Sequence, residues 1–297
     1  MKILVPVDGS KPSLHALKVL GTQGTFLGDN PDITILNVQP PIPARICALE
    51  QPEGVQDYYR TEAGEVMEKV TATLPPELQN AHMIYRVGHP AEVIAEEAEK
   101  LDVDLIIMGS HGHRALGALL FGSVSNEVLA NVKRPTLIVR DQIPADLDGL
   151  KIGVAVDGSP YSERAIQYLI DQRELFGPKA TLTLIHASTD FSSIVMPSMA
   201  GVPIRTMNRR EVSELQSESF EMALKPLKPM LDKEGIVYSV AHVQGNPGDA
   251  IAKYAREHKL DLIVMGSHGY NSIDAVLLGS VAMRIAAISK EPLLIIR

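Results

Sequence analysis

The feature that most constrains the fold of this chain is a stretch of 20 residues that occurs twice. Residues 104–123 read DLIIMGSHGHRALGALLFGS, and residues 261–280 read DLIVMGSHGYNSIDAVLLGS. The glycine spacing is the same in both copies, Gly-x2-Gly-x9-Gly-Ser, formed first by Gly109, Gly112, Gly122 and Ser123 and then by Gly266, Gly269, Gly279 and Ser280. A loop of constant length that occurs twice predicts two copies of one domain in a chain of 297 residues.

Each copy has the properties of a phosphate-binding loop. The unbroken apolar run over residues 105–108 suits a parallel strand that is covered on both faces. Glycines after its carboxyl end permit tight turns and let backbone N–H groups approach a ligand. Gly-Ser then opens a helix, whose first N–H groups are unpaired and carry the positive end of the helix dipole. Simple turn geometry, with Ser123 as the helix N-cap, is the alternative explanation.

The repeat also sets the domain boundaries. Asp8 matches Asp157 at an offset of 149, whereas Gly109 matches Gly266 at an offset of 157. The second copy has therefore gained eight residues, which we place in segment 189–210, the counterpart of residues 40–56. We expect both segments to be long connections at the carboxyl end of the sheet, either lids or unstructured insertions. The predicted organisation is a first domain over residues 1–142, a linker over 143–149 and a second domain over 150–297.

Strand and helix patterns alternate through each copy. In the first copy we expect strands over residues 2–7, 33–38, 83–87, 105–108 and 135–140. We expect helices after Ser10, over residues 56–74, from Pro90, and from Gly122 to Lys133. In the second copy, Ser159-Pro160 and Asn246-Pro247 are helix starts. This alternation predicts right-handed βαβ units and a mostly parallel sheet, and hence an α/β fold.

Composition narrows the range of partners. The net charge is −8 without a cluster of Lys or Arg, which argues against nucleic acid as a partner. The chain has no run of 18 apolar residues, and the run before Asp8 is too short for a signal peptide, so we expect no membrane association and a cytoplasmic location. The lone Cys47 excludes an internal disulfide, and the histidines lack the spacing of a zinc site, so no protein-held metal is predicted.

The chain resembles a tandem universal stress protein, with two UspA-type domains in one polypeptide. The resemblance covers nearly the whole chain and rests on the glycine motifs, the openings ILVPVDGS (3–10) and IGVAVDGS (152–159), and the closing strands RPTLIVR and EPLLIIR. It implies two Rossmann-like domains of the adenine nucleotide alpha hydrolase type, each with a five-stranded parallel sheet of order 3-2-1-4-5 and helices on both faces. It also implies that the closing strands join the two domains in an internal pseudo-dimer. We further expect a homodimer of whole chains.

The resemblance also implies a ligand and its contacts. Members that carry the glycine motif are similar in binding ATP or a related adenine nucleotide, so we expect ATP, ADP or AMP, with Mg²⁺ brought by the nucleotide. In the first copy the family's contacts fall on Pro6, Asp8 and Val38 around the base and ribose, on Met108 and Gly109 beneath the sugar, and on Gly112, Gly122, Ser123, Val124 and Ser125 at the phosphates. In the second copy they fall on Ala155, Asp157, Ala187, Met265, Gly266, Gly269, Gly279, Ser280, Val281 and Ala282.

Some of these positions have a second interpretation. Asp-Gly-Ser is a good turn and capping sequence in its own right, which is the alternative for Asp8 and Asp157. His111 and His268 occupy equivalent loop positions and could contact a phosphate or a magnesium-bound water, or could simply be solvated. Met108 and Met265 also suit core packing at a strand end.

The two copies differ at the predicted phosphate end. Ala282 lacks the hydroxyl of Ser125, and Asp274 adds a negative charge in the second loop, whereas the first loop has Arg114. Both changes disfavour a polyphosphate, because the alanine removes a hydrogen-bond donor and the carboxylate adds a like charge, which repels by roughly 1 kcal/mol or more at a few ångströms on a surface. The sequence therefore predicts that the first site binds nucleotide more tightly.

Two classes of function remain. The first is a regulatory module of the stress response that binds adenine nucleotide. The second is an enzyme on the same fold, an ATP hydrolase or a nucleotidyl transferase. Neither loop contains GxxxxGK[ST] with its lysine, the SGGxDS pattern or a paired acid and base, so we predict no catalytic residues and at most slow ATP hydrolysis. A structural pseudo-dimer with empty clefts is a third possibility.

Overall fold

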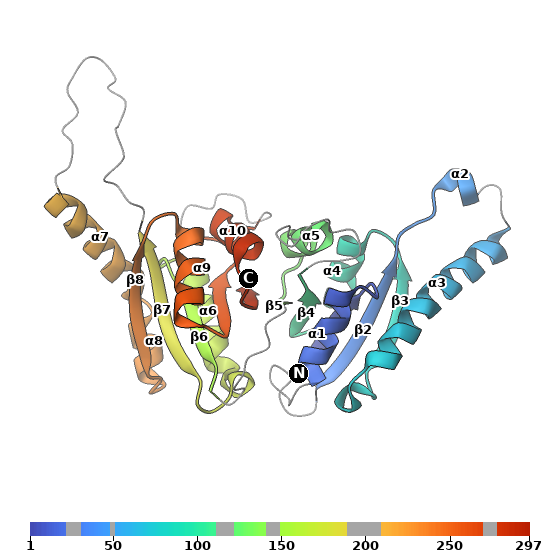
Figure 1. Cartoon of the computed structure of the whole chain (residues 1–297), viewed down its shortest axis with the longest axis horizontal. Coiled ribbons are helices and arrows are strands. Elements are labelled where there is room, and N and C mark those ends of the chain that lie inside the picture. The colour runs from blue at the N-terminus through green and yellow to red at the C-terminus, as the bar shows by residue number, and fades with distance from the viewer. Residues whose placement is uncertain (22–30, 48–50, 111–121, 141–148, 189–208, 270–277) are drawn as a thin grey trace, which may run out of the picture.

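The computed structural model describes residues 1–21, 31–47, 51–110, 122–140, 149–188, 209–269 and 278–297. In these ranges ten strands form one sheet in the order β3-β2-β1-β4-β5-β10-β9-β6-β7-β8. We call residues 1–140 the first half and residues 149–297 the second half; Figure 1 shows them on the two sides of the sheet's centre. Each half has the predicted order 3-2-1-4-5, which is confirmed.

The elements of the first half follow the predicted alternation. Its strands are β1 (Lys2–Val7), β2 (Asp32–Gln39), β3 (His82–Val87), β4 (Leu105–Gly109) and β5 (Thr136–Val139). Its helices are α1 (Lys11–Gly21), α2 (Ala44–Cys47), α3 (Pro52–Thr73), the 3-10 helix η1 (Pro76–Leu78), α4 (Pro90–Lys100) and α5 (Ser123–Asn131). The helix predicted over 56–74 begins earlier, at Pro52, because a proline is well tolerated in the first turn of a helix.

The second half repeats this order. Its strands are β6 (Lys151–Ala155), β7 (Thr181–Ser188), β8 (Tyr238–Gln244), β9 (Leu262–Gly266) and β10 (Leu293–Ile296). Its helices are α6 (Pro160–Asp171), the 3-10 helix η2 (Arg173–Phe176), α7 (Arg209–Leu224), α8 (Lys228–Lys233), α9 (Pro247–His258) and α10 (Ser280–Ile288). The predicted caps are confirmed, since the side chains of Ser159 and Asn246 accept from backbone N–H groups of α6 and α9.

Two of the predicted segments fall mainly on residues outside the described ranges. The linker predicted over 143–149 is one, and the inserted segment 189–210 is the other. Within the counterpart segment 40–56, α2 and the start of α3 are described.

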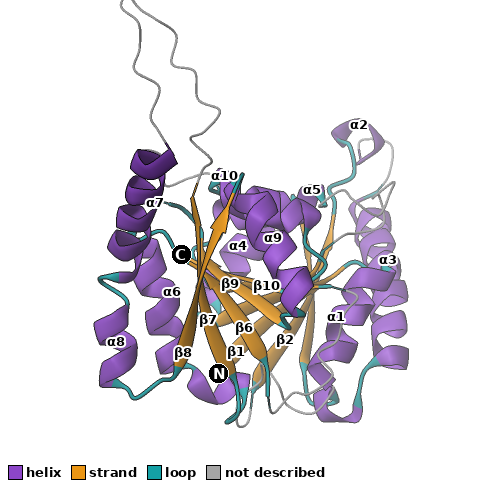
Figure 2. Ribbon diagram, turned by 60° about the vertical axis from the view of Figure 1, so that its left-hand side comes forward, coloured by secondary structure: helices purple, strands orange, loops and turns teal. Residues whose placement is uncertain are grey.

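Helices cover both faces of the sheet, as Figure 2 shows. On one face α1, α3, α6 and α8 contribute Leu17, Val70, Ile166 and Leu231 to a buried apolar cluster. On the other face α4, α5, α9 and α10 contribute Ile94, Leu129, Ile251 and Ile285. Because each cluster also contains side chains of both β5 and β10, each core continues from one half into the other. No helix in the described part of the chain is long and apolar enough to cross a membrane.

The two halves are joined by their closing strands. β5 and β10 pair antiparallel, with Ile138 opposite Leu293 and Thr136 opposite Ile295. This pairing satisfies backbone groups that would otherwise lie exposed at two sheet edges. The predicted pairing of the halves through RPTLIVR and EPLLIIR is therefore confirmed. A homodimer of whole chains stays a prediction.

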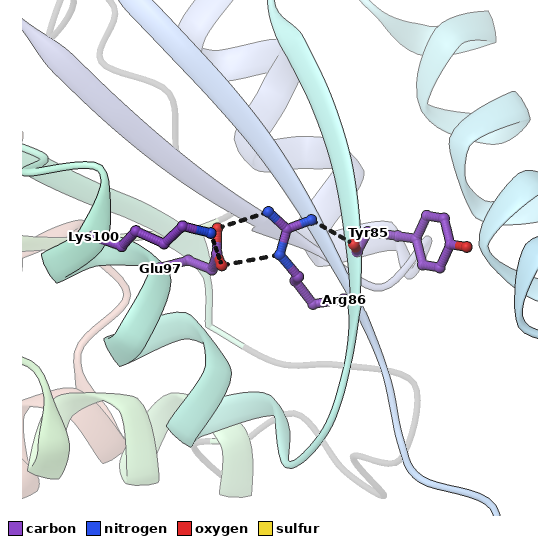
Figure 3. Close-up of polar contacts among 4 residues, drawn as sticks. All are labelled: Tyr85, Arg86, Glu97 and Lys100. Atoms are coloured by element: carbon purple, nitrogen blue, oxygen red, sulfur yellow. Dashed lines mark hydrogen bonds and ion pairs between the residues drawn. The ribbon is translucent and has the colours of Figure 1, made fainter.

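An ion pair fastens α4 to the edge strand β3 in the first half (Figure 3). The Arg86 guanidinium donates to the two carboxylate oxygens of Glu97 at 2.9 and 3.1 Å, and to the Tyr85 carbonyl at 2.9 Å. Lys100 Nζ lies 3.1 Å from the same carboxylate. Burial by itself would raise the pKa of Glu97, but the hydrogen bonds and charges of Arg86 and Lys100 outweigh it and hold that pKa below its ordinary value.

Candidate functional site

The predicted site residues of each half lie at the carboxyl ends of its central strands. Asp8 directly follows β1, and Gly109 ends β4; Asp157 and Gly266 hold the equivalent places in the second half. Between β1 and β4 the strand order reverses, so the carboxyl ends of these two strands frame a crevice. The helices α5 and α10 begin at this same edge, since Gly122 and Gly279 lie against the residues that follow β4 and β9.

Part of each glycine loop lies outside the described residues. Gly112, His111 and Arg114 belong to residues 111–121, and Asp274 belongs to residues 270–277. The roles predicted for these four residues stay predictions.

The Asp-Gly-Ser segments form turns that orient the two carboxylates. Asp8 Oδ1 accepts from Ser10 N at 3.0 Å, and Gly9 has a φ of 74°, which glycine adopts without strain. In the second half Asp157 Oδ1 accepts from Ser159 N at 3.0 Å and from Ser162 Oγ at 2.8 Å. The interpretation of these segments as turn and capping sequences is confirmed. Binding of a ribose or an adenine amine by the same carboxylates stays a prediction.

Gly109 and Gly266 have a packing role that the sequence did not reveal. A Cβ on Gly109 would lie 2.6 Å from the Pro12 backbone, and one on Gly266 would lie 2.5 Å from Tyr161 Cβ. Both distances are too short for any side chain, so each glycine lets the first turn of a helix lie directly on the end of its strand. The predicted place beneath a sugar is not needed to explain these two residues, and it stays a prediction.

Gly269 brings the second loop against Asp157, which follows β6, and Gly279 brings the start of α10 against the residues that follow β9. A Cβ on Gly269 would lie 2.6 Å from Asp157 Oδ2, and one on Gly279 would lie 3.1 Å from the Ser267 carbonyl. The structure therefore brings together Asp157 and Gly269, two residues that the sequence assigned to one site from stretches more than 100 residues apart.

The first turns of α5 and α10 present backbone donors at this edge. Gly122 is the N-cap of α5, and its N–H already donates to the Ser110 carbonyl at 3.1 Å. Gly279 is the N-cap of α10, and its N–H donates to the Ser267 carbonyl at 2.8 Å. Since glycine has no side chain, neither cap covers the next N–H groups. These belong to Ser123, Val124 and Ser125 in α5 and to Ser280, Val281 and Ala282 in α10.

Ser123 and Ser280 are exposed first residues of their helices. The alternative that assigned the N-cap to Ser123 is therefore wrong, because Gly122 occupies that position. An exposed serine beside uncapped N–H groups at the positive end of a helix dipole is an arrangement that suits an anion.

Ser125 points elsewhere. Its hydroxyl donates to the Gly109 carbonyl at 3.3 Å, and the residue is 4% exposed. The equivalent Ala282 is buried as well. The hydroxyl therefore joins α5 to the end of β4, and its predicted contact with a phosphate stays a prediction.

The crevice between the central strands differs between the halves. β1 pairs with β4 at only two positions, the last of which joins Leu4 and Ile106. β6 pairs with β9 at four positions, the last of which joins Ala155 and Met265. The central strands of the first half therefore separate earlier along the chain, by two residues.

A proline explains this difference. The Lys2 carbonyl accepts from Asp104 N at 2.8 Å, so the even-numbered backbone groups of β1 face β4. Pro6 stands where the second half has Ala155, and a proline has no N–H to donate. The missing donor ends the ladder between β1 and β4 beside the predicted base and ribose contacts.

The strands next to β1 and β6, which are β2 and β7, carry different polar side chains near their carboxyl ends. In the first half Asn37 Nδ2 donates to the Val7 carbonyl at 2.8 Å. In the second half His186 Nδ1 donates to the Val156 carbonyl at 2.9 Å, and Ser188 Oγ bonds His242 Nε2 at 2.5 Å. Val38 and Ala187, the predicted contacts to the base, lie half-buried beside these groups.

Sequence reasoning missed the pair His186 and His242, which we call the histidine layer, because it examined these two residues only for zinc spacing. The signal was available, since His186 aligns with Asn37 at the offset of 149.

His268 is buried, with Nδ1 2.9 Å from Ser267 Oγ and its ring 5.1 Å from that of Tyr161, so the solvated alternative is wrong for it. Met108 and Met265 are buried, as their core interpretation requires. Among the described residues no group of three His, Cys, Asp or Glu side chains could hold a metal ion.

Comparisons with known proteins agree with this architecture. The model of the universal stress protein family matches residues 1–140 and 150–297. Universal stress protein Rv1996 of Mycobacterium tuberculosis is 23% identical over 320 residues, which cover 99% of this chain and 94% of the relative. Universal stress protein MJ0531 of Methanocaldococcus jannaschii is 31% identical over 147 residues, covering 50% of this chain and 81% of the relative. The crystal structure of a universal stress protein from Archaeoglobus fulgidus superposes with a TM-score of 0.65 at 24% identity, covering 100% of this chain and 96% of that one.

Proposed function

Because this chain belongs to the universal stress protein family, we propose that it is a regulatory module of the stress response that binds adenine nucleotide. The phosphates of ATP, ADP or AMP lie at the N-termini of α5 and α10, and the base and ribose lie beside the carboxylates that follow β1 and β6. A partner protein reads whether a nucleotide is bound.

The observation that carries this proposal is the glycine N-cap of each helix. A glycine at this position supplies no side-chain acceptor to the next three N–H groups of the helix, at a sheet edge where the strand order reverses. In most helices a Ser, Thr, Asp or Asn side chain would accept from one of them. Uncapped donors cost stability unless water or a ligand accepts from them, and an anion is the acceptor that the dipole favours most.

We propose that the first half binds the nucleotide more tightly. Pro6 ends the pairing of β1 with β4 two residues earlier than Ala155 allows in the second half, so the first crevice offers more unpaired strand end to a base or ribose. The second loop also carries Asp274, an added negative charge that disfavours phosphates, whereas the first loop carries Arg114.

Mg²⁺ enters this proposal only as a companion of the nucleotide. The described residues provide no cluster of carboxylates or histidines for a metal ion. Such an ion is therefore held chiefly by the phosphates, as Mg²⁺ commonly is. Slow ATP hydrolysis is the alternative activity. A turnover far above about 1 per minute, abolished by one side-chain change, would favour an enzyme over a binding module.

Calorimetry with Mg-ATP on the Gly122→Val and Gly279→Val variants tests the proposal. A valine at either N-cap places a branched side chain beside the first N–H groups of the helix; for Gly279 the Ser267 carbonyl lies only 3.1 Å from the new Cβ. We expect Gly122→Val to remove the tighter binding event and Gly279→Val the weaker one. A larger loss from Gly279→Val would refute the preference for the first half.

Gly64→Ala is the matched control, since a Cβ at Gly64 meets no atom within 4 Å. It should leave both binding events unchanged. If both N-cap variants bind Mg-ATP as the unaltered protein does, the proposed function itself is wrong.

A further inference from the structure

Two arginines cross the junction between the halves and bind the helices of the opposite half. Arg140, which follows β5, donates from Nη2 to the Ala286 carbonyl of α10. Arg297, which follows β10, donates from Nη2 to the Leu129 carbonyl of α5. The two arginines lie 157 residues apart, and so do the two residues that accept from them. This is also the offset between the two glycine motifs. The same contact is therefore made twice, in opposite directions.

Each acceptor is a carbonyl that its own helix leaves without a donor. The last backbone bond of α5 joins Val132 N to the Val128 carbonyl at 2.9 Å, so the Leu129 carbonyl is the next one along. The last bond of α10 joins Ser289 N to the Ile285 carbonyl at 2.8 Å, which leaves Ala286. Carbonyls of the last helical turn need an external donor, and a positive charge there is favoured by the negative end of the dipole.

The Arg140 contact is shielded from water and the Arg297 contact partly so, which strengthens them. Arg140 is 8% exposed, and its own carbonyl lies 3.0 Å from His15 Nε2 of α1. Burial lowers the pKa of the Arg297 guanidinium, although an arginine stays charged at any physiological pH. Leu129 and Ala286 are fully buried. A hydrogen bond from a charged donor gains strength in such surroundings.

The same two helices carry the proposed phosphate sites at their other ends. α5 spans nine residues, from Ser123 to Asn131, and is therefore about 14 Å long. Its N-terminus faces the crevice of the first half, while its last turn is held by Arg297 from the second half. α10 is held in the same way by Arg140.

We propose that Arg297 and Arg140 are positioning residues that complete each phosphate site from the opposite half. Each guanidinium fixes the end of a short helix, so the N–H groups at the other end are ordered before the anion arrives, and binding then costs less ordering entropy. This inference rests on the proposed function, because it concerns the same two sites.

The test uses the full chain with either arginine changed to methionine. Arg297→Met and Arg140→Met keep an apolar stem of similar length but remove the charge and the donors. Mg-ATP is titrated into ¹⁵N-labelled protein, and the amides of Ser123 and Ser280 report the two sites separately by NMR. We expect Arg297→Met to weaken the site at α5 by about threefold to tenfold and to change the site at α10 by less than about twofold.

Arg140→Met should give the reverse pattern, and Arg297→Lys, which keeps a charge and a donor, should recover most of the loss. A crossed pattern distinguishes positioning from general destabilisation, because instability would weaken both sites in both variants. Equal losses at the two sites, a larger loss in the arginine's own half, or no loss at either site would overturn the inference.

Hydrogen exchange of the ligand-free protein gives a second measurement that needs no nucleotide. Arg297→Met should speed exchange of the α5 amides more than that of the α10 amides, and Arg140→Met should do the opposite. If the unaltered protein does not respond to Mg-ATP, the proposed function fails, while the exchange pattern still decides whether the arginines hold these helices. Exchange that changes equally in α5 and α10 in both variants would overturn the inference.

Discussion

The two halves share the turns and helix caps that border their crevices, and they differ in the pairing of their central strands and in the surrounding side chains. Both have an Asp-Gly-Ser turn after the first strand, a glycine that packs under a helix, and a glycine N-cap. Around this common backbone, the second half has His186, His242 and Tyr161 where the first half has Asn37, Tyr85 and Pro12. Features made by the backbone tolerate changes in neighbouring side chains. The comparison teaches that the backbone of the proposed anion site is common to the halves, whereas the side chains proposed to contact a base are not.

The cores differ by compensating changes. Gly153 stands where the first half has Leu4, and Leu260 stands where it has Val103. A Cβ on Gly153 would lie 2.4 Å from Leu260 Cδ1, so the larger leucine of α9's following loop fills the space that the glycine leaves. Exchanges that conserve total volume are the ones that a packed core accepts best.

The edge strands differ in the chemistry that holds them. The ion pair of Arg86 and Glu97 has no equivalent in the second half, where Val243 and Tyr254 occupy these positions. The Tyr254 ring instead stacks on His258 at 3.7 Å. Buried ion pairs can often be replaced by packed side chains of similar volume with little loss of stability, which is consistent with both solutions occurring in one chain.

The largest expected effect tests whether the shared backbone matters equally in both halves. Gly109→Val and Gly266→Val should each lower the free energy of unfolding by about 2–4 kcal/mol, because the new side chains collide with the backbone of Pro12 or with Tyr161. Urea unfolding followed by circular dichroism measures this. Gly64→Ala is the control and should be neutral or stabilising, since it adds a helix former in open space. A loss confined to one of the two valine variants would break the comparison.

The next effect concerns the ion pair that only the first half has. Glu97→Gln should lower the free energy of unfolding by about 1–3 kcal/mol, because it leaves the Arg86 guanidinium without its carboxylate. We expect no larger loss of stability, because the Arg86 side chain is 38% exposed and solvent screens its charge. Tyr254→Phe at the equivalent position is the control, and we expect a change within about 0.5 kcal/mol.

This pair also has a defined pH dependence. Since the pKa of Glu97 lies below its ordinary value of 4.5, the pair stabilises the fold fully above that pH. The contribution is lost as the pH falls through the lower pKa of the folded state. The unaltered protein should therefore lose more stability than Glu97→Gln on acidification below pH 4.5. Parallel loss in both proteins would show that the pair does not hold the pKa down.

A smaller effect, a dependence of stability on pH, should come from His186 and His242 in the second half. Burial, and to a lesser degree the neighbouring His186, lower the pKa of His242 below its ordinary value of 6.5. The folded state then binds fewer protons than the unfolded state below that pH, so stability falls on acidification. His242→Tyr, which introduces the residue of the first half, should remove this dependence, worth under about 1 kcal/mol between pH 7.5 and 5.5 for a largely exposed group. Urea midpoints at the two pH values measure it, and an unchanged slope would contradict the prediction.

The smallest effect sharpens the comparison at the phosphate end. Ser125→Ala gives the first half the residue of the second. Because the hydroxyl donates to the Gly109 carbonyl, we expect a loss of stability of about 0.5–1 kcal/mol and an affinity for Mg-ATP that changes by less than about twofold. Calorimetry with Mg-ATP on this variant and on Ala282→Ser measures whether the hydroxyl contributes to the affinity. A tenfold loss of affinity would show that the hydroxyl reaches the phosphate, as the sequence comparison alone suggested.

The sequence predicted those features that local patterns and the repeat encode. Strand order, the helix starts at Ser159 and Asn246, and the pairing of the closing strands are confirmed, because each depends on periodicity, capping chemistry or a family resemblance. The close contacts of Gly109 and the inward turn of Ser125 were not predicted, because they depend on how nearly a helix approaches a strand. Sequence spacing does not contain that distance.

The two arginines illustrate the same limit across the junction. Arg140 and Arg297 end the two closing segments, and the repeat alone shows that they are equivalent. Their acceptors, Leu129 and Ala286, lie in the other half, and only the antiparallel pairing of β5 with β10 brings them within reach.

The covalent link between the halves has an evolutionary consequence. In a dimer of identical subunits every substitution is made twice, so a change that improves one crevice alters the other equally. Here β5 and β10 build the same kind of junction from two different sequences, and each crevice can mutate alone. A proline ends the strand pairing early in one of them while an alanine extends it in the other, so natural selection can adjust two crevices independently on a single scaffold.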